Sequence, residues 1–328
     1  MEIEKHYNGK KVLVTGGLGF IGSNLCIRLA SLGASVRILN KNPRRLEGST
    51  FNISPAEAKT EIIFGDMCDS GMIGKAVRGI DVIFHLAGRA SHVDSMTDPV
   101  GDANANAESA LYLIEGARKN SPSAKIVYTG TRGQYGNAKA LPVKEEHPKN
   151  PVDINGINKQ AAEDYFLFYS HSNSLSACCL RLGNIYGPRM QMKNKNQGFI
   201  SWFIRQAIDD ETINVFGDGL QRRDFVYVDD VVDAMLLCGM KWETNSQAYN
   251  LGGDAYSVLD TAKLVVKSAG SGSVKTTPYT EGHKKVEVGD FVPDCSKLHA
   301  LGWKPRVSFE DGLKRTIAYY RENKLNYW

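Results

Sequence analysis

The sequence predicts an α/β fold, with a Rossmann-type, doubly wound parallel sheet followed by a smaller, mixed α/β lobe in the C-terminal part. In the first half, short apolar segments alternate with segments of helical period, which indicates strands that helices cover on both faces. A glycine series, Gly16, Gly19 and Gly22, stands between the first such strand and the first helix. After NIYGPR, which ends at residue 189, the alternation gives way to helices mixed with very short strands, which predicts the second lobe.

The individual elements follow from the apolar period and from the residues that end each segment. We expect the first strand at 10–16, where an apolar run stops at glycine, and the first helix at 20–33, which ends at Gly33. The other strands of the sheet are expected at 35–40, 60–66, 81–88, 124–130 and 175–183. Further helices are expected at 72–79, 100–119, 156–170, 198–208, 229–240 and 259–270. The predicted domains are 1–182, with 214–250 partly returning to it, and 183–328.

The composition argues against several classes of protein. With 328 residues, 42% of them hydrophobic, the chain can bury a large core. Its formal charge of +4 comes without a dense basic run, so no nucleic-acid partner is expected. Six cysteines show no metal-ligand spacing; we expect no metal site, and a reducing, cytoplasmic location. No apolar run is long enough to span a bilayer and residues 1–10 lack a signal-peptide core, so no membrane association is expected.

The glycine series has the context that a dinucleotide site requires. Glycine permits a positive φ and a close approach to a pyrophosphate, and the N-terminus of the following helix offers free N–H groups to that anion. The preceding strand and the following helix make this motif more specific than a lone triplet. At the end of the second strand, Asn40 suits the ribose hydroxyls of NAD, while Lys41, Arg44 and Arg45 suit the 2′-phosphate of NADP. We expect NAD, with NADP as the alternative.

Several stretches together resemble the extended short-chain dehydrogenase/reductase family and, within it, the branch of nucleotide-sugar epimerases and dehydratases. These stretches are TGGLGFIG, FHLAG, YTGTRGQYG, RLGNIYGPR, VFGDGLQRRDFVYVDDVV, YNLGG and LGWKPRVSFEDGL. They extend over nearly the whole chain, so the resemblance implies the family's fold and an NAD(P)-dependent enzyme. It also implies the cofactor-binding residues, which are Gly16, Gly19, Phe20, Ile21, Gly22, Asn40, Asp66, Met67, Leu86, Ala87, Asn106 and Lys159.

The chain departs from this family at one catalytic position. In the family a tyrosine moves the proton of a sugar hydroxyl, a nearby lysine lowers the pKa of that tyrosine, and a serine or threonine bonds the same hydroxyl. The lysine and the threonine correspond to Lys159 and Thr131, but Asn155, in PVDINGINKQ, stands in the place of the tyrosine. A carboxamide forms hydrogen bonds but has no pKa near neutrality, so Asn155 cannot shuttle a proton.

Three explanations compete for the missing tyrosine. In the first, another group is the base: Tyr135 beside Thr131, Lys159 with a pKa depressed by a dry pocket, or His92 or Asp94 after the fourth strand. In the second, the substrate needs little help, as with a ketone that is reduced with a proton from water. In the third, the protein only binds a sugar nucleotide. We favour the first two together and count Tyr135 among the candidate catalytic residues.

The resemblance implies a nucleoside-diphosphate sugar as the ligand, bound by Thr131, Asn184, Arg189, Val215 and Arg223. Cations and fixed donors are what a diphosphate needs. A second arginine of the family corresponds to Glu287, so Lys284, Lys285 or Arg189 would have to compensate for it.

Two features narrow the reaction that the resemblance implies. Dehydratases and decarboxylases of the branch carry acids just after the threonine, where this chain has Arg132 and Gly133. We therefore predict hydride transfer at a ring carbon with net 4-epimerisation. A 4-dehydrogenase or ketoreductase is one alternative, and a non-catalytic sugar-nucleotide binding protein is the other. The family's four-helix contact, here from helices at 100–119 and 156–170, predicts a homodimer.

Overall fold

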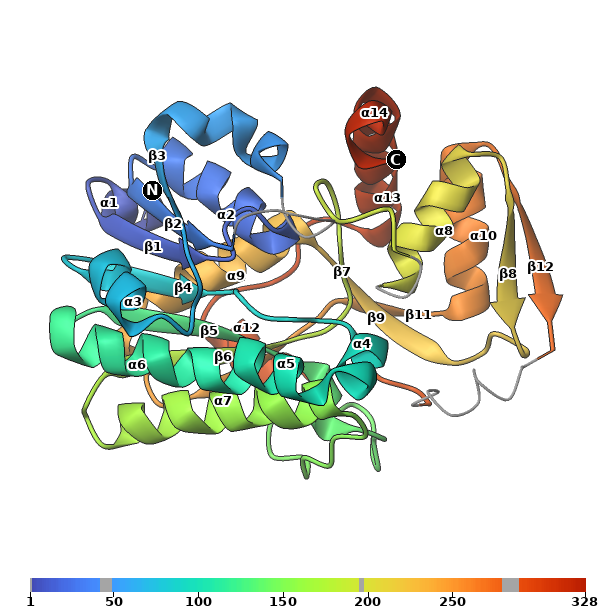
Figure 1. Ribbon diagram of the computed structural model, residues 1–328. Coiled ribbons are helices and arrows are strands. Elements are labelled where there is room, and N and C mark those ends of the chain that lie inside the picture. The colour runs from blue at the N-terminus through green and yellow to red at the C-terminus, as the bar shows by residue number, and fades with distance from the viewer. Residues whose placement is uncertain (1, 42–48, 195–197, 279–288) are drawn as a thin grey trace.

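The computed structural model describes residues 2–41, 49–194, 198–278 and 289–328. Its centre is a seven-stranded sheet of order β10-β6-β5-β4-β1-β2-β3, in which each neighbouring pair is parallel (Figure 1). The strands are β1 (Lys11–Thr15), β2 (Ser35–Asn40), β3 (Thr60–Phe64), β4 (Val82–His85), β5 (Lys125–Thr131), β6 (Ser176–Leu182) and β10 (Ala248–Leu251). The predicted doubly wound sheet is confirmed. Its strand order reverses between β1 and β4, the place where such sheets bind ligands.

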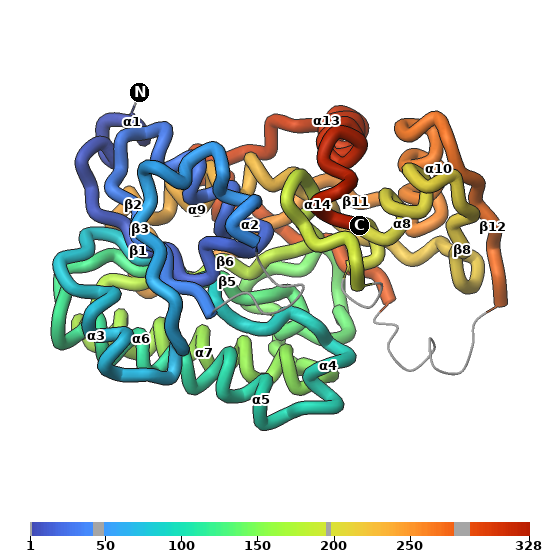
Figure 2. Tube along the Cα trace, turned by 45° about the horizontal axis from the view of Figure 1, so that its top comes forward, coloured from blue at the N-terminus to red at the C-terminus, as the bar shows by residue number. Residues whose placement is uncertain are grey.

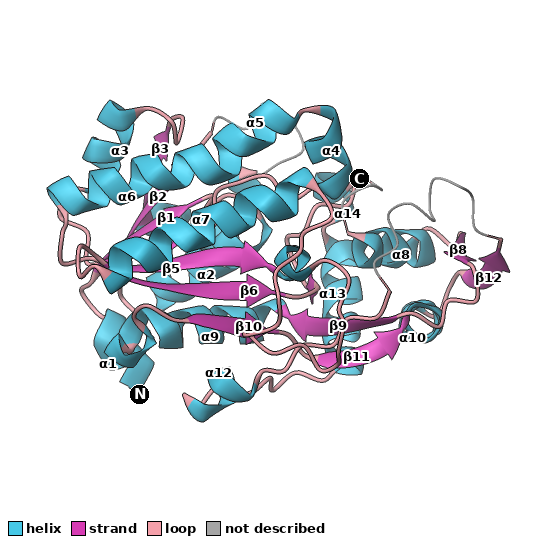
Figure 3. Ribbon diagram, turned by 90° about the horizontal axis from the view of Figure 1, so that it is seen from below, coloured by secondary structure: helices cyan, strands magenta, loops and turns pink. Residues whose placement is uncertain are grey.

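Helices cover both faces of this sheet. One layer consists of α1 (Glu2–Tyr7), α2 (Phe20–Ser31) and α9 (Val228–Met240). The other consists of α3 (Ser70–Val77), α6 (Ser109–Asn120) and α7 (Ile154–His171), and Figure 3 shows α7 lying along β5 and β6. Val12 and Val14 of β1 enter the core under the first layer, whereas Leu13 enters the core under the second. Successive strand residues point to opposite faces, so a continuous apolar run is what this position requires.

The second lobe lies beyond the carboxyl ends of β5 and β6, whose arrowheads point toward it in Figure 3. Its strands form two small sheets, β11-β9-β7 and β12-β8. They are β7 (Ile185–Tyr186), β8 (Thr212–Phe216), β9 (Arg222–Tyr227), β11 (Asp254–Ser257) and β12 (Ser273–Thr277). Its helices are α8 (Phe199–Ile208), α10 (Val258–Ala269), α13 (Phe309–Glu322) and α14 (Lys324–Tyr327) (Figure 2). A third core fills this lobe, in which the rings of Phe225 and Phe309 stack with centroids 4.6 Å apart.

The prediction of a single helix over 100–119 is wrong in one respect, because the helix is interrupted. The structure has α5 (Pro99–Ala103), a π-helical turn η2 (Asn104–Glu108) and then α6. Such turns insert a residue into the helical ladder and are frequent at functional sites. The pattern also gave no signal for several short elements. They are α4 (His92–Thr97), α12 (Ser296–Ala300) and the 3₁₀ turns η1 (Thr50–Lys59), η3 (Arg132–Tyr135) and η4 (Trp242–Thr244).

The chain returns to the main sheet after it has formed part of the second lobe. β10 pairs with β6, and α9 packs on β4 and β5, although both follow β7 and β8 in sequence. Among the helices that the structure describes, none is both long and apolar enough to cross a membrane.

Candidate functional site

The loop between β1 and α2 is closed too tightly for side chains. Gly16 has a φ of +72°, and a Cβ there would lie 2.9 Å from a backbone nitrogen of the loop after β4; a Cβ on Gly22 would overlap the Gly16 carbonyl oxygen. Gly19 precedes α2, and no side chain caps this helix. The N–H groups of Phe20 and Ile21 are therefore available at the positive end of a 12-residue helix. This cradle fits the pyrophosphate of a dinucleotide.

The carboxyl ends of β2 and β3 lie next to this cradle. Asn40, the last residue of β2, contacts the loop between β1 and α2, because its Oδ1 accepts a hydrogen bond from Leu18 N at 3.4 Å. Met67, after β3, is buried. Arg44 and Arg45, the cations considered for a 2′-phosphate, lie outside the described residues.

Asp66 after β3 is held as a carboxylate. Its Oδ1 accepts a bond from Cys68 N at 3.0 Å, and its Oδ2 lies 3.1 Å from the Nζ of Lys41. The bond from Cys68 is the main reason that the pKa of Asp66 is lowered, with Lys41 adding to it and partial burial opposing it. Lys41 is thus paired with Asp66. One of the cations considered for the 2′-phosphate of NADP is therefore already bound to a carboxylate.

Thr15 fixes the backbone after β4. Its Oγ1 accepts bonds from Leu86 N at 3.2 Å and Ala87 N at 3.1 Å, and it lies 2.8 Å from His85 Nδ1. Because this oxygen already accepts two bonds, its own hydrogen donates to Nδ1. His85 is neutral, since burial lowers its pKa to about 3. The residues Leu86 and Ala87 are thereby held against the loop at Gly16.

A buried carboxylate, Asp102, organises the centre of the site. Its Oδ1 accepts bonds from Asn106 Nδ2 at 3.0 Å and Asn158 Nδ2 at 2.8 Å, and its Oδ2 accepts one from Asn155 Nδ2 at 3.1 Å. Asn155, which is 2% exposed, also donates to the Arg89 carbonyl at 2.9 Å. Three amides therefore satisfy a carboxylate that would be costly to bury alone. They also direct the side chain of Asn155 into the protein.

Lys159 and Asn106 meet beside Gly88. A Cβ on Gly88 would overlap Asn106 Oδ1 and lie 2.9 Å from Lys159 Nζ, so a glycine is needed here. Within the described residues, Asn106 Oδ1 is buried and has no hydrogen-bond partner. Burial lowers the pKa of Lys159 to about 8, while the charge of Asp102 acts to raise it. An unsatisfied buried acceptor beside a buried amine, at the end of β4, indicates a place for polar groups of a ligand.

Thr131 ends β5 with a hydroxyl that can donate. Its Oγ1 accepts a bond from Gly133 N at 3.1 Å and caps the turn η3. The ring of His92 lies close by: a Cβ on Gly133 would be 3.3 Å from His92 Cε1 and 3.4 Å from Thr131 Oγ1. His92 Nδ1 is 2.7 Å from Asp153 Oδ2. Thr131 and His92 therefore border the same space above Gly133.

The position of Tyr135 does not suit the base that the sequence suggested. Its ring is fully buried, its hydroxyl donates to Asn250 Oδ1 at 2.7 Å, and it accepts from Arg181 Nη1 at 2.6 Å. Burial raises its pKa to about 12, although Arg181 acts in the opposite direction. Arg181 in turn pairs with the buried Glu163 at 2.7 Å. This geometry indicates that Tyr135 supports the packing of β5, β6 and β10.

Two of the expected substrate residues line β9 and its neighbour β7. Arg223 is largely buried, and its Nη1 donates to the carbonyls of Arg222 and Gly289. Asn184 Nδ2 donates to Asp224 Oδ1 at 3.2 Å. Burial raises the pKa of Asp224 to about 6, with Arg132 and Asn184 acting to lower it.

The other expected substrate residues have different surroundings. Arg189 donates to Asn24 Oδ1 at 2.8 Å and to the Asn52 carbonyl at 3.0 Å, and its guanidinium lies over the ring of Tyr319. Val215 is 1% exposed, within the core of the second lobe. This geometry gives both residues packing contacts and offers no support for contact with a ligand. Lys284, Lys285 and Glu287 lie outside the described residues.

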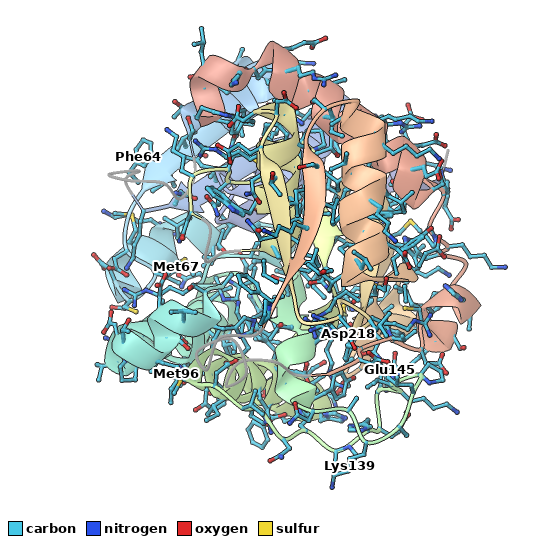
Figure 4. The ribbon with its side chains drawn as sticks, turned by 90° about the vertical axis from the view of Figure 1, so that its right-hand side faces the viewer. Phe64, Met67, Met96, Lys139, Glu145 and Asp218 are labelled. Atoms are coloured by element: carbon cyan, nitrogen blue, oxygen red, sulfur yellow. The ribbon has the colours of Figure 1, made fainter. Side chains whose placement is uncertain are left out.

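Figure 4 views the molecule from the side of the second lobe. Phe64, Met67 and Met96 follow one edge of this view, from the end of β3 to α4, while Asp218 and Glu145 lie on the other side. Met96 is 60% exposed, whereas Met67 is buried. The loops after β3 and β4 thus lie together on one side, and the turn after β8 lies apart from them.

Sequence reasoning missed two acids of this site, Asp102 and Asp153. The spacing of Asp102 and Asn106, four residues apart in an expected helix, was a signal, because such residues are neighbours on one face. Asp153 stands just before a helical pattern, where it suits an N-cap. No cluster of three or more potential metal ligands exists within the residues that the structure describes.

This chain is similar to several known proteins. Residues 12–252 match the model of the NAD dependent epimerase/dehydratase family. The UDP-glucose 4-epimerase of Mycolicibacterium smegmatis is 32% identical over 95% of this chain and 98% of that protein. The dTDP-D-glucose 4,6-dehydratase of Mus musculus is 30% identical over 97% of this chain and 90% of that protein. The crystal structure of UDP-glucose 4-epimerase with UDP-glucose from Thermotoga maritima is 32% identical, with a TM-score of 0.87 over 96% of this chain and 99% of that one. This chain belongs to the NAD dependent epimerase/dehydratase family.

Proposed function

We propose that this protein is an NAD-dependent nucleotide-sugar 4-epimerase. The observation that carries the proposal is the meeting of Lys159 and Asn106 at Gly88, next to the glycine cradle, with Thr131 at the end of the adjacent strand. Carboxyl ends of neighbouring parallel strands share one edge of the sheet, so these groups face a common space. The UDP-glucose 4-epimerases among the similar proteins support the same reaction.

The cofactor fits the residues that are present. The uncapped N-terminus of α2 suits the pyrophosphate, Asn40 the adenosine ribose, and Lys159 with the unsatisfied Asn106 Oδ1 the nicotinamide end. When bound, NAD supplies a carbon that takes a hydride from the sugar ring and later returns it. The protein contributes binding, orientation and the movement of the hydroxyl proton.

Asn155 occupies, in this proposal, the place of the family tyrosine. Its amide is engaged by Asp102 and by the Arg89 carbonyl, so it acts as a support for the buried carboxylate. Thr131 keeps the role of bonding the sugar hydroxyl, because its own hydrogen is free to donate while its oxygen accepts from Gly133. We do not include Tyr135 among the catalytic residues, because its hydroxyl is bound by Asn250 and Arg181.

The nucleotide end of the substrate is assigned to Arg223 and Asn184. A guanidinium beside an amide provides charge and fixed donors for a diphosphate. We leave out Arg189 and Val215, whose contacts are to packing partners.

The test is to add a panel of UDP-, dTDP-, GDP- and CDP-sugars to the NAD-loaded protein. Nicotinamide absorbance follows the cofactor, and NMR identifies the sugar. An epimerase gives a sugar inverted at C4 and returns the cofactor to its starting state. Stoichiometric reduced cofactor with a keto sugar would instead show a dehydrogenase. Binding without either change would leave only a sugar-nucleotide binding protein and would refute the proposal.

We also propose a homodimer formed through α6 and α7, the helices of the expected four-helix contact. Ile157 and Phe168 of α7 are 48% and 68% exposed, and Val100 of α5 is 70% exposed. Large apolar side chains gathered on neighbouring helices suit an interface. Light scattering should give twice the chain mass of 36.1 kDa, and Phe168→Glu should lower it toward the monomer. A monomer mass for the wild type in dilute solution would refute the dimer.

We infer a cytoplasmic location from the cysteines. All six are free, and five are buried, which fits a reducing compartment.

A further inference from the structure

His92 and Asp153 form a pair between two elements that border the proposed active site. His92 begins α4, and Asp153 precedes α7, the helix that carries Lys159. The pair joins Nδ1 to Oδ2 at 2.7 Å. The imidazole is half-exposed, at 54%, whereas the carboxylate is only 14% exposed. A fixed carboxylate therefore anchors a ring whose other edge stays accessible.

Asp153 is well suited to orient the ring because its carboxylate is itself fixed. Its Oδ1 accepts a bond from Gly156 N at 2.7 Å and so caps α7, which leaves Oδ2 for His92. Burial alone would raise the pKa of Asp153, but the bonds from His92 and from the backbone of α7 hold it below its ordinary value. An ionised Oδ2 can only accept a hydrogen bond, which favours the tautomer with its hydrogen at Nδ1 and its lone pair at Nε2.

One ring atom of His92, Cε1, lies close to the threonine. Cε1, the atom between the two ring nitrogens, would lie 3.3 Å from a Cβ on Gly133, and Thr131 Oγ1 would lie 3.4 Å from the same point. Nε2 adjoins Cε1 on the side away from Asp153. A substrate hydroxyl in this space can accept a bond from Thr131 and donate one to Nε2, at the ~2.6–3.2 Å that proton transfer needs. Gly133 keeps the space open because it has no side chain.

Asn155, Tyr135 and Lys159 are each less well placed for this role. Asn155 points inward to Asp102 and to the Arg89 carbonyl, and it cannot carry a proton. Tyr135 is buried against Arg181 and Asn250. Lys159 lies at Gly88, on the cofactor side of the site. Of the groups that border the space beside Thr131, the imidazole has a ring nitrogen whose lone pair can accept a proton and return it.

We propose that His92 is the catalytic acid–base residue of this enzyme and that Asp153 is its positioning residue; the proposal rests on the hydride-transfer function proposed above. In the oxidising half, the O–H bond of the sugar hydroxyl breaks and its proton forms an N–H bond at Nε2. The electron pair left on oxygen becomes the C=O bond while a hydride leaves the same carbon for the oxidised cofactor. In the returning half, a hydride adds to the opposite face of that carbon, and the N–H proton goes back to the oxygen.

The first test compares His92→Gln with a matched control in the NAD-loaded protein, on the nucleotide sugar that the panel identifies. Glutamine keeps hydrogen-bonding groups but cannot move a proton, so kcat should fall about 10²- to 10⁴-fold with little change in KM. Added imidazole should restore part of the kcat lost in His92→Ala. His171→Gln makes the same change at the exposed end of α7 and should leave kcat unchanged. A kcat for His92→Gln within threefold of the wild type would overturn the role of His92 while the epimerase function survives.

The second test concerns Asp153. Asn is also a good N-cap, so Asp153→Asn keeps the helix start but removes the charge that fixes the ring. We expect kcat to fall at least tenfold while the melting temperature stays within a few degrees. An unchanged kcat would remove Asp153 from the proposal.

A third readout does not depend on turnover. Long-range ¹H–¹⁵N correlation of the NAD-bound protein, with His92→Gln to assign the signal, should show His92 protonated at Nδ1 and bare at Nε2. The Nε2 shift should move when UDP-sugar is added. A ring protonated at Nε2 would overturn the proposal even if the panel found no reaction. An Nδ1–H ring that responds to the sugar in a protein without turnover would support the His92 arrangement and locate the failure in the proposed function.

Discussion

Asn155→Ala should destabilise the protein although no substrate is involved, because Asn155 helps to satisfy the buried Asp102. The substitution removes the bond to Asp102 Oδ2 at 3.1 Å and the bond to the Arg89 carbonyl at 2.9 Å. A hydrogen bond to a charged acceptor contributes about 1.5–3 kcal/mol and one to a neutral carbonyl about 0.5–1.5 kcal/mol. The expected loss of unfolding free energy is therefore roughly 2–4.5 kcal/mol.

The corresponding change in melting temperature follows from the size of the chain. An unfolding entropy of about 2.1 cal/mol/K per residue gives roughly 0.7 kcal/mol/K for this protein. Scanning calorimetry at a fixed NAD concentration should thus show Tm lower by about 3–6 °C. Asn137→Ala, the same change at an exposed position, should leave Tm within about 1 °C. If Asn155→Ala also shifted Tm by less than that, Asp102 would not depend on Asn155.

Two further predictions concern the cofactor cradle and the buried lysine. Gly22→Ala should weaken NAD binding at least tenfold (about 1.4 kcal/mol) in titration calorimetry, because its Cβ would overlap the Gly16 carbonyl, whereas Gly74→Ala in α3, with its nearest contact at 3.7 Å, should bind normally. The pKa of Lys159 is about 8 in the folded protein against 10.5 for the free side chain, so the unfolded chain binds more protons between these values. Relative to Lys159→Met, the wild type should therefore gain up to about 3 kcal/mol of stability between pH 8 and 10.5, measured by urea unfolding; a flat or falling difference would contradict the lowered pKa of Lys159.

Local patterns predicted the scaffold well, because the strands and helices of the first half depend on their own apolar period and on the residues that end each segment. The cradle at Gly16 and Gly22 was also predictable, since the requirement for glycine is set within seven residues of chain. Tyr135 shows where local reasoning fails. Its place at the end of β5 suggested an active-site group, but its hydroxyl is bound by Arg181 of β6 and Asn250 of β10. Both partners are distant in sequence, and only the sheet order brings them to Tyr135.

The hydrogen bonds that organise the site could not be predicted either, because most of them join residues that are distant in sequence. Asp102 is satisfied by Asn106 from the π turn that follows α5, but also by two amides of α7, more than fifty residues away. A pattern of isolated asparagines gives no reason to place three of them on one carboxylate. The π turn at Asn106 is likewise a tertiary effect, since the sequence period over 100–119 is that of an ordinary helix.

Two residues at the start of α7 have different partners. Asp153 faces His92, whereas Asn155 faces Asp102. Asn155→Tyr in the His92→Gln protein removes one bond to Asp102 and restores a tyrosine at the position that corresponds to the family's proton carrier. We expect kcat to recover at least tenfold over His92→Gln alone, and Tm to fall because a charged acceptor loses about 1.5–3 kcal/mol of bonding. In the wild type the same tyrosine should add little to kcat, because His92 already moves the proton. No recovery in the His92→Gln protein, with the fold intact by circular dichroism, would mean that a tyrosine at 155 does not reach the hydroxyl that Thr131 binds.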